Sequence, residues 1–329
     1  MYPAGGPRAP RVATPGAGSA ESKETGAAPI GSDASCFTGR KRSVMSRSGV
    51  TKSEISELLS ASGRVPKRSL GQNFLVDQNY AKKIASIAAG DGGPVAEIGP
   101  GIGSLTVFLA ERCARVTAVE KDQEIASLLT RVLEARGITN VEVIVADALE
   151  VDWSGLLAGR GIRRVAGNLP YNVSVPIIMK LVDDGAGIDG MAFLLQREVA
   201  ERLAARPGAR ESSAASLKLQ LRFAASIATG VPATVFMPVP NVASAVLELR
   251  ADSRYLGRYG REAVDAAVGA ARTAFAHRRQ MLRRTLSDAR LAAALAESGV
   301  EETRRPESLT IEEWLAIGVA LTGKERDHA

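Results

Sequence analysis

The chain has 329 residues, of which 45% are hydrophobic and 24% are charged. These fractions are ordinary for a globular protein and exclude a wholly disordered or fibrous chain. The two cysteines, Cys36 and Cys113, are too few for a disulfide scaffold, and the two histidines, His277 and His328, leave no histidine cluster for a metal. The sequence contains no run of about 18 or more apolar residues, so no membrane-spanning helix is predicted. The net charge of +6 permits a polyanionic partner without requiring one.

Residues 1–64 differ in composition from the rest of the chain. Residues 1–36 are rich in Gly, Ala, Pro and Ser without apolar periodicity, which predicts a disordered extension. The stretch lacks the apolar region of a secretory signal, and its acidic residues are unusual for a transit peptide. An alternative is that translation starts at Met45 and that the residues before it are not part of the protein. Within the extension, Ser53 to Leu59 predicts a short helix capped by Ser53.

Beyond the extension, short apolar runs alternate with helical patterns. Runs that end at Gly, Pro or polar residues predict buried strands, and apolar residues three or four positions apart predict helices. The predicted strands span 95–98, 115–120, 141–147, 163–171, 190–196, 217–228 and 242–250, and the helices between them span 104–113, 124–137, 176–184 and 197–205. This alternation predicts an α/β fold with a doubly wound, mostly parallel sheet of seven strands. Residues 257–329 carry only helical patterns and predict a small all-helical domain.

A glycine-rich loop, Gly99-Pro100-Gly101-Ile102-Gly103, follows the first of these strands. Glycines at a strand-to-helix turn let the backbone approach a ligand closely, beside the free N–H groups of the helix. The feature alone is weak, because any α/β protein can place a tight turn there. The G-x-G-x-G spacing differs from the G-x-G-x-x-G fingerprint of dinucleotide sites, which disfavours a nicotinamide-dependent dehydrogenase.

Three acidic residues point to the cofactor. Glu97 lies two positions before the first glycine, which is unfavourable beside a pyrophosphate but favourable near a cationic group. Glu120 and Asp147 end the next two strands, at the carboxyl edge where ligands bind in such sheets, and an acid in the position of Glu120 accepts hydrogen bonds from ribose hydroxyls. A ligand with a ribose, an adenine and a positive sulfonium fits this set, so we expect S-adenosylmethionine.

The tetrapeptide Asn168-Leu169-Pro170-Tyr171 ends the fourth predicted strand and resembles the signature of methyltransferases that modify the N6 of adenine. The exocyclic nitrogen of adenine is a poor nucleophile because its lone pair is delocalised into the ring. The side-chain oxygen of Asn168 and a nearby backbone carbonyl can accept its two N–H groups and favour a tetrahedral nitrogen in the transition state. Pro170 stiffens the turn, and the ring of Tyr171 can stack on an extruded base, a contact worth about 1–3 kcal/mol. The alternative is an ordinary Asx-Pro turn.

Further motifs make the chain similar to the small-subunit ribosomal RNA adenine dimethyltransferase family over about residues 64–320. They are KRSLGQNFL (67–75), EIGPGIGSLT (97–106), VEKD (119–122), AD (146–147), GNLPYN (167–172), FMPVP (236–240) and VASAV (242–246). The resemblance implies a Rossmann-like, S-adenosylmethionine-dependent methyltransferase domain over 65–251 and a helical RNA-binding domain over 257–329. It also implies an enzyme that dimethylates two adjacent adenines in a hairpin loop near the 3′ end of 16S rRNA. Such an enzyme acts on the immature 30S subunit in the cytoplasm. It is expected to be a monomer that binds no metal and has no membrane partner.

The resemblance also assigns individual residues. The cofactor-binding residues that it implies are Asn73, Leu75, Gly99, Gly101, Glu120, Asp147, Ala148 and Asn168. The catalytic residues that it implies are Asn168, Leu169, Pro170 and Tyr171, with Phe236 stacked on the second face of the target adenine. The alternative for Phe236 is a core aromatic before a proline-rich loop. The chain departs from the family pattern at Asn241 and Ala243, where Lys and Asp are usual, and in the segment Ser212–Leu217; both departures concern RNA contacts rather than the chemistry.

A basic segment, residues 271–286, predicts an RNA-binding surface. It contains five arginines and no acid, and its pattern predicts one amphipathic helix on which Arg279 and Arg283 share a face. The predicted RNA-binding residues are Lys67, Arg68, Arg272, Arg278, Arg279, Arg283 and Arg284. The alternative for the segment is a solvated run of charges.

Two functional alternatives stay open from the sequence. One is an adenine N6-methyltransferase of large-subunit 23S rRNA, of the macrolide-resistance type, which shares the NLPY motif. The other is a non-catalytic RNA-binding or transcription factor built on the same fold. The intact Glu120, Asp147 and NLPY motif disfavour a protein that has lost catalysis.

Overall fold

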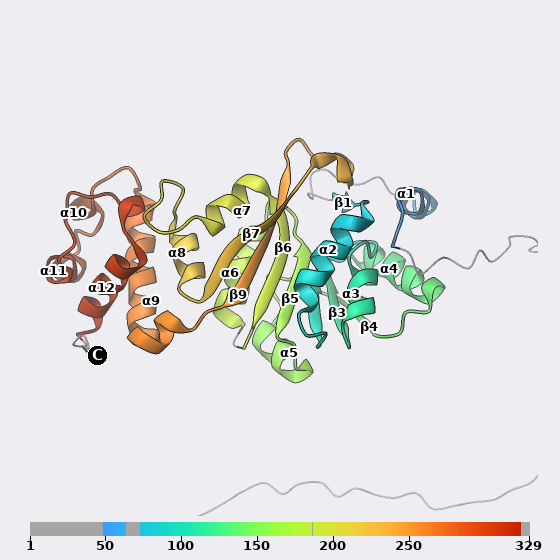
Figure 1. Cartoon of the computed structure of the whole chain (residues 1–329), viewed down its shortest axis with the longest axis horizontal. Helices are drawn as coiled ribbons and strands as arrows, with labels where there is room; N and C mark the ends of the chain where they lie inside the picture. The colour runs from blue at the N-terminus through green and yellow to red at the C-terminus, as the bar shows by residue number, and fades with distance from the viewer. Residues whose placement is uncertain (1–48, 64–72, 186, 324–329) are drawn as a thin grey trace, which may run out of the picture. The chain divides into compact units, whose positions relative to one another are not determined.

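A computed structural model describes residues 49–63, 73–185 and 187–323 (Figure 1). All of them belong to residues 44–329, one of the two units into which the chain divides. The predicted extension up to residue 48, with Met45, lies outside the described residues, as do Lys67 and Arg68. No helix in the described ranges is both long and apolar enough to span a membrane.

The core of the fold is a seven-stranded sheet with the strand order β4-β3-β2-β5-β6-β9-β7. The first five of these strands are parallel, and β9 alone runs antiparallel to both of its neighbours. The bounds are β2 Val95–Ile98, β3 Val116–Glu120, β4 Val141–Val145, β5 Arg164–Asn168, β6 Gly190–Gln196, β7 Phe223–Val231 and β9 Ser244–Ala251. A separate antiparallel pair joins β1 (Phe74–Leu75) to β8 (Phe236–Met237). The predicted seven-stranded, mostly parallel sheet is therefore confirmed.

Helices cover both faces of the sheet (Figure 1). Successive residues of a strand point to opposite faces, so Phe193 of β6 joins one hydrophobic core and its neighbour Leu194 joins another. The core containing Phe193 packs against α5 (Trp153–Arg160), α6 (Ser174–Asp184) and α7 (Arg197–Ala204). On the opposite face lie α2 (Gln78–Ala89), α3 (Thr106–Arg112) and α4 (Gln123–Arg136). Burial of both faces explains why the strands appear in the sequence as continuous apolar runs.

Residues after β9 form helices around a third hydrophobic core that contains Trp314, fully buried at 0% exposure. The helices are α9 (Arg254–Ala276), α10 (Leu282–Thr285), α11 (Ala289–Ser298) and α12 (Ile311–Thr322). Single 3₁₀ turns occur at Ala233–Val235 and Pro306–Ser308. The helical character predicted for 257–329 is confirmed over its described residues.

The predicted strand over 217–228 is wrong in its first half. Residues Ala214–Gln220 form helix α8, and β7 begins only at Phe223. The N-terminus of α8 is capped by Ser213, whose hydroxyl accepts the N–H of Ser216 at 3.1 Å. This cap satisfies an N–H group that the first turn of a helix leaves without an intrahelical partner, and it favours the helix despite the alternating apolar pattern.

The short helix predicted over Ser53–Leu59 is confirmed as α1 (Lys52–Ala61), so the disorder predicted for residues 1–64 is wrong for residues 49–63. The cap is Thr51 rather than Ser53, because Thr51 and Glu54 exchange side-chain and backbone hydrogen bonds in a capping box. The buried side chains of Ile55 and Leu59 pack against a core under the glycine loop. Glu54 also forms a 2.9 Å ion pair with Arg136 at the end of α4. The side chain of Arg136 is 2% exposed.

Tight packing of α9 against α12 gives a first testable prediction. A Cβ atom at Gly318 of α12 would lie 2.2 Å from the carbonyl oxygen of Ala263 in α9. Gly318→Ala is therefore expected to force the two helices apart and to lower the free energy of unfolding by about 1–3 kcal/mol in urea titrations. Gly269→Ala is the matched control, because its Cβ meets no atom within 4 Å, and alanine there is expected to stabilise α9 by up to about 1 kcal/mol. Equal losses of stability in both variants would show that close packing at Gly318 is not the cause.

Candidate active site

The glycine loop owes its residue types to its backbone. Gly99, Gly101 and Gly103 have φ angles of 66°, 57° and 95°, in the left-handed region that side chains disfavour. Space is also short, because a Cβ on Gly103 would lie 2.8 Å from the side chain of Leu129 in α4. The loop therefore turns sharply from β2 toward α3 and brings its backbone to the edge of a cavity.

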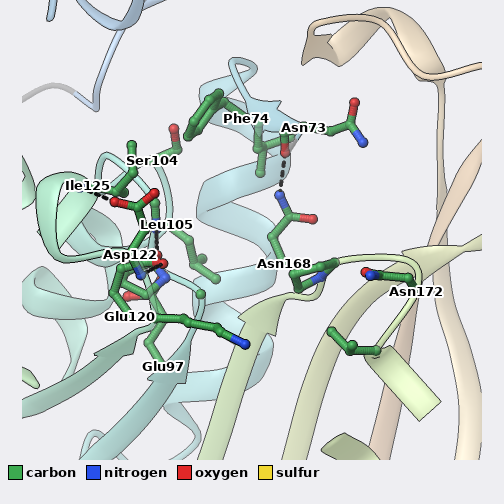
Figure 2. A pocket seen from close by; sticks show the side chains of 17 residues that line it. Asn73, Phe74, Glu97, Ser104, Leu105, Glu120, Asp122, Ile125, Asn168 and Asn172 are labelled. Atoms are coloured by element: carbon green, nitrogen blue, oxygen red, sulfur yellow. Dashed lines mark hydrogen bonds between the residues drawn. The ribbon is translucent and has the colours of Figure 1, made fainter. Parts of the chain in front are cut away.

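This cavity measures about 420 Å³ and lies at the carboxyl ends of β2, β3 and β5 (Figure 2). It is lined by Asn73, Phe74, Leu75, Glu97, Gly99, Pro100, Gly101, Ser104, Leu105, Glu120, Lys121, Asp122, Ile125, Asn168, Pro170, Asn172 and Val173. The structure thus brings together six residues predicted to bind the cofactor: Asn73, Leu75, Gly99, Gly101, Glu120 and Asn168. They come from four separate segments of the chain.

The carboxylate of Glu120 connects the end of β3 to the glycine loop. One oxygen accepts the N–H of Gly101 at 3.2 Å, and the other accepts the N–H of Asp122 at 3.0 Å (Figure 2). Burial raises the pKa of Glu120, and these two hydrogen bonds oppose that rise. Because each carboxylate oxygen has more than one lone pair, the group still has acceptor capacity toward a ribose.

Asn168 stands at the carboxyl end of β5, and its amide orientation is determined by one contact. Its Nδ2 donates a 2.8 Å hydrogen bond to the backbone carbonyl of Asn73 (Figure 2). A carbonyl only accepts hydrogen bonds, so the nitrogen of the amide must face it. The side-chain oxygen Oδ1 is therefore left as an acceptor at the cavity.

Two buried polar atoms at the cavity have no hydrogen-bond partner within the described residues. They are Oε2 of Glu97, whose residue is 1% exposed, and Oγ of Ser104. Burial raises the pKa of Glu97 to about 8, the hydroxyl of Thr106 lowers it, and the negative charge of Glu120 raises it further. An acceptor and a hydroxyl without partners fit a ligand that carries positive charge and polar groups, as S-adenosylmethionine does.

Two predicted cofactor residues do not line this cavity. Asp147 follows β4 and pairs with Lys121, whose Nζ lies 2.6 Å from Oδ2 of Asp147. The hydrogen bond from Lys121 lowers the pKa of Asp147. Ala148 is 7% exposed and belongs to the hydrophobic core beneath the sheet. Lys121 itself lines the cavity.

The predicted catalytic residues beyond Asn168 are held in different ways. Pro170 lines the cavity, whereas Leu169 is buried in the core at 1% exposure. The hydroxyl of Tyr171 lies 3.2 Å from Oγ of Ser244 at the start of β9, which fixes the half-buried ring. Phe236 is 2% exposed and packs in a hydrophobic core, with its backbone paired to Leu75. This packing favours the core alternative for Phe236, and its stacking role stays a prediction.

Sequence reasoning missed part of the cavity wall. Phe74, Pro100, Leu105, Ile125 and Val173 line it with apolar surface, and their types carry no functional signal because they resemble any core residue. The charged residue Lys121 also lines the cavity, although its sequence motif assigns it no role of its own. Its position directly after β3 was the available signal, because the carboxyl ends of parallel strands face the ligand.

The basic segment 271–286 is not one helix, so the predicted shared face of Arg279 and Arg283 is wrong. Helix α9 ends at Ala276, and α10 covers only Leu282–Thr285. The segment contains no acidic residue, but acidic residues from 301–308 lie close to two of its arginines. Arg278 lies 3.8 Å from Glu307, and Arg283 lies 3.9 Å from Glu302. The other three arginines, Arg272, Arg279 and Arg284, are exposed and form no ion pair within the described residues.

The chain is similar to known ribosomal RNA methyltransferases. A family model described as ribosomal RNA adenine dimethylase matches residues 64–322. The chain is 38% identical over 291 residues to ribosomal RNA small subunit methyltransferase A of Geobacillus sp. (strain WCH70), covering 84% of this chain and 99% of that protein. It is 39% identical over 274 residues to the protein of the same name from Magnetococcus marinus, covering 80% of this chain and 94% of that protein.

Two solved structures resemble the fold. A dimethyladenosine transferase from Plasmodium falciparum gives a TM-score of 0.61 at 21% identity, covering 74% of this chain and 95% of that one. The 23S rRNA methyltransferase ErmE gives a TM-score of 0.53 at 26% identity, covering 76% of this chain and 99% of that one. The first likeness supports the fold alone. The family model covers residues 64–322, which include all the residues that line the cavity.

Proposed function

The chain belongs to the ribosomal RNA adenine dimethylase family, and we propose that it dimethylates the N6 of two adjacent adenines in the 3′-terminal hairpin loop of 16S rRNA. The substrate would be the immature 30S subunit, met in the cytoplasm, and the methyl donor would be S-adenosylmethionine. The relatives named for small-subunit rRNA methylation, which the chain matches over most of its length, support this choice.

The orientation of Asn168 is the observation that carries the proposal. Its Nδ2 is engaged by the carbonyl of Asn73, so its Oδ1 is available to an amino group at the cavity. A backbone carbonyl of the turn that follows β5 would be the second acceptor. Two acceptors on one adenine amino group favour the tetrahedral nitrogen that attacks a methyl carbon, and they act more strongly in the transition state than in the ground state.

The other residues of the site would bind the cofactor and orient the target base. S-adenosylmethionine, when bound, supplies an electrophilic methyl group on a sulfonium. Glu120 would accept the ribose hydroxyls, and the apolar wall that includes Phe74 and Ile125 would exclude water from the reacting atoms. Tyr171, held by Ser244, would offer its ring to the target base. The transfer needs no covalent enzyme intermediate.

A methylation assay on two substrates tests this function. The purified full-length protein with labelled S-adenosylmethionine is expected to label 30S particles from a strain lacking the mark, and to form dimethyladenosine in 16S rRNA. Protein-free 23S rRNA is the second substrate, since ErmE acts on 23S rRNA by its name. Activity on 23S rRNA alone would contradict the proposal and favour the resistance-type alternative.

We further propose that residues 65–251 form the methyltransferase domain and that residues 257–329 form an RNA-binding domain. The exposed Arg279 and Arg284 support this role, since they form no ion pair within the described residues. The double variant R279Q/R284Q is expected to bind 30S particles more weakly and to reduce the slope of log affinity against log salt by about 0.7–0.9 for each phosphate that it no longer neutralises. Arg131→Gln, an exposed arginine on α4, is the control. An unchanged salt slope in the double variant would contradict an RNA contact at these positions.

A further inference from the structure

Glu97 is a carboxyl group buried where the fold offers it no partner. It lies in β2, where all four residues are buried, and its strand neighbours in register are Ala118 of β3 and Ala166 of β5. Its Oε2 has no hydrogen-bond partner within the described residues, although the side chain lines the cavity. A buried polar atom of this kind is costly and calls for an explanation in the bound state.

Among the described residues that line the cavity around Glu97, the one cation is Lys121. From β3 and its following turn, Glu97 faces the acids Glu120 and Asp122 and the cation Lys121, which is paired with Asp147. From α3, the hydroxyl of Thr106 lowers the pKa of Glu97. The charge of Glu97 acts in turn on Cys113, directly after α3, and burial raises the pKa of this thiol to about 11, so the thiol stays neutral. From β5, the cavity presents the neutral Asn168.

We propose that Glu97 recognises the positive charge of the cofactor, and that cofactor binding transfers the proton of this carboxyl group to solvent. The proposal rests on the proposed function and deepens it. In the free protein, burial beside other acids holds the carboxyl in its neutral form. When a cationic ligand enters, the carboxylate is stabilised by opposite charge at short range, and its proton leaves.

The direction of the pH dependence follows from this exchange. Below pH 8, the free protein must lose a proton from Glu97 when it binds the ligand, so the affinity rises with pH up to about 8. Above that pH, Glu97 is already ionised and the dependence on this group ends. The ligand's own amino group titrates near the same pH, since an α-amino group has a pKa of about 8. A comparison with a variant that lacks the carboxyl group therefore separates the contribution of Glu97 from that of the ligand's amino group.

Calorimetry tests the proposal without any measurement of activity. Binding of S-adenosylmethionine is measured at pH 7 in phosphate and in Tris, whose ionisation enthalpies differ, so that the difference in heat counts protons released. The wild-type protein is expected to release most of a proton, up to about nine-tenths for a group with a pKa near 8. Glu97→Gln is expected to release none and to bind at least about tenfold more weakly at pH 8 than the wild type. Glu134→Gln, an exposed acid on α4, is the matched control and is expected to behave as the wild type.

A second ligand identifies which cationic group is recognised. S-adenosylhomocysteine lacks the sulfonium charge but keeps the ammonium group. Proton release that persists with this product assigns the ammonium group to Glu97, and release that disappears assigns the sulfonium; both results support the proposal. Binding of S-adenosylmethionine to the wild type without proton release would overturn it, even if the variant proved unstable. Failure of the wild type to bind S-adenosylmethionine would instead contradict the proposed function.

Discussion

Replacing Asn168 by alanine is expected to lower the rate of methyl transfer by about 100- to 1,000-fold at saturating S-adenosylmethionine. This is the range observed when one preorganised hydrogen-bonding group that serves the transition state is removed. The loss arises because Oδ1 is the side-chain acceptor that the geometry directs at the cavity, while Nδ2 is engaged by the carbonyl of Asn73 at 2.8 Å. Alanine removes the acceptor and leaves the strand end in place.

Single-turnover transfer to 30S particles measures this effect apart from binding. The dissociation constant for S-adenosylmethionine, measured separately, is expected to change far less than the rate. Asn79→Ala, an exposed asparagine in the first turn of α2, is the matched control and is expected to retain full activity. A rate for Asn168→Ala within threefold of the wild type would exclude Asn168 as the acceptor.

The free energy of unfolding of the ligand-free protein is expected to fall as pH rises from about 5 to about 8, because of Glu97. In the unfolded chain the carboxyl ionises near its ordinary pKa of 4.5, whereas in the folded protein it holds its proton up to a pKa of about 8. The folded state therefore binds more protons than the unfolded state in this window, and raising the pH favours unfolding. A shift of this size corresponds to on the order of 5 kcal/mol, fully expressed above about pH 8.

Urea unfolding at pH 5.5, 7 and 8.5 checks this expectation. Glu97→Gln mimics the protonated acid, so it is expected to match the wild type near pH 5 and to exceed its stability increasingly toward pH 8.5. Glu134→Gln, which changes an exposed acid, is expected to follow the wild type at every pH. A difference between Glu97→Gln and wild type that does not vary with pH would show that Glu97 is ionised in the folded protein.

The elements that could be predicted from the sequence are those with one dominant local signal. Strand β6, Gly190–Gln196, has the predicted bounds because an uninterrupted apolar run buried on both faces has few alternatives. Helix α8 could not be predicted, because apolar residues at alternate positions mimic a strand, and only the hydrogen bonds at Ser213 decide for the helix. The end of helix α9 at Ala276 could not be predicted either, because arginines fit the pattern of a helix surface whether or not the helix continues.

The candidate site divides in the same way. Glu120 and Asn168 were predictable because each ends a strand, and parallel strands present their carboxyl ends at one edge of the sheet. The apolar wall was not predictable, since Phe74 and Ile125 meet only in the folded chain. The ion pair between Lys121 and Asp147 depends on the side-chain positions at two strand ends, and no sequence spacing indicates it.

Mapping of dimethyladenosine in 16S rRNA tests the central claim most directly. Ribosomal RNA from a strain lacking the gene is compared with RNA from the same strain carrying the wild-type gene or the Asn168→Ala variant. We expect both adjacent dimethyladenosines near the 3′ end to be absent without the gene, restored by the wild type and not restored by the variant. Persistence of both marks in the strain lacking the gene, or their restoration by Asn168→Ala, would contradict the proposed function.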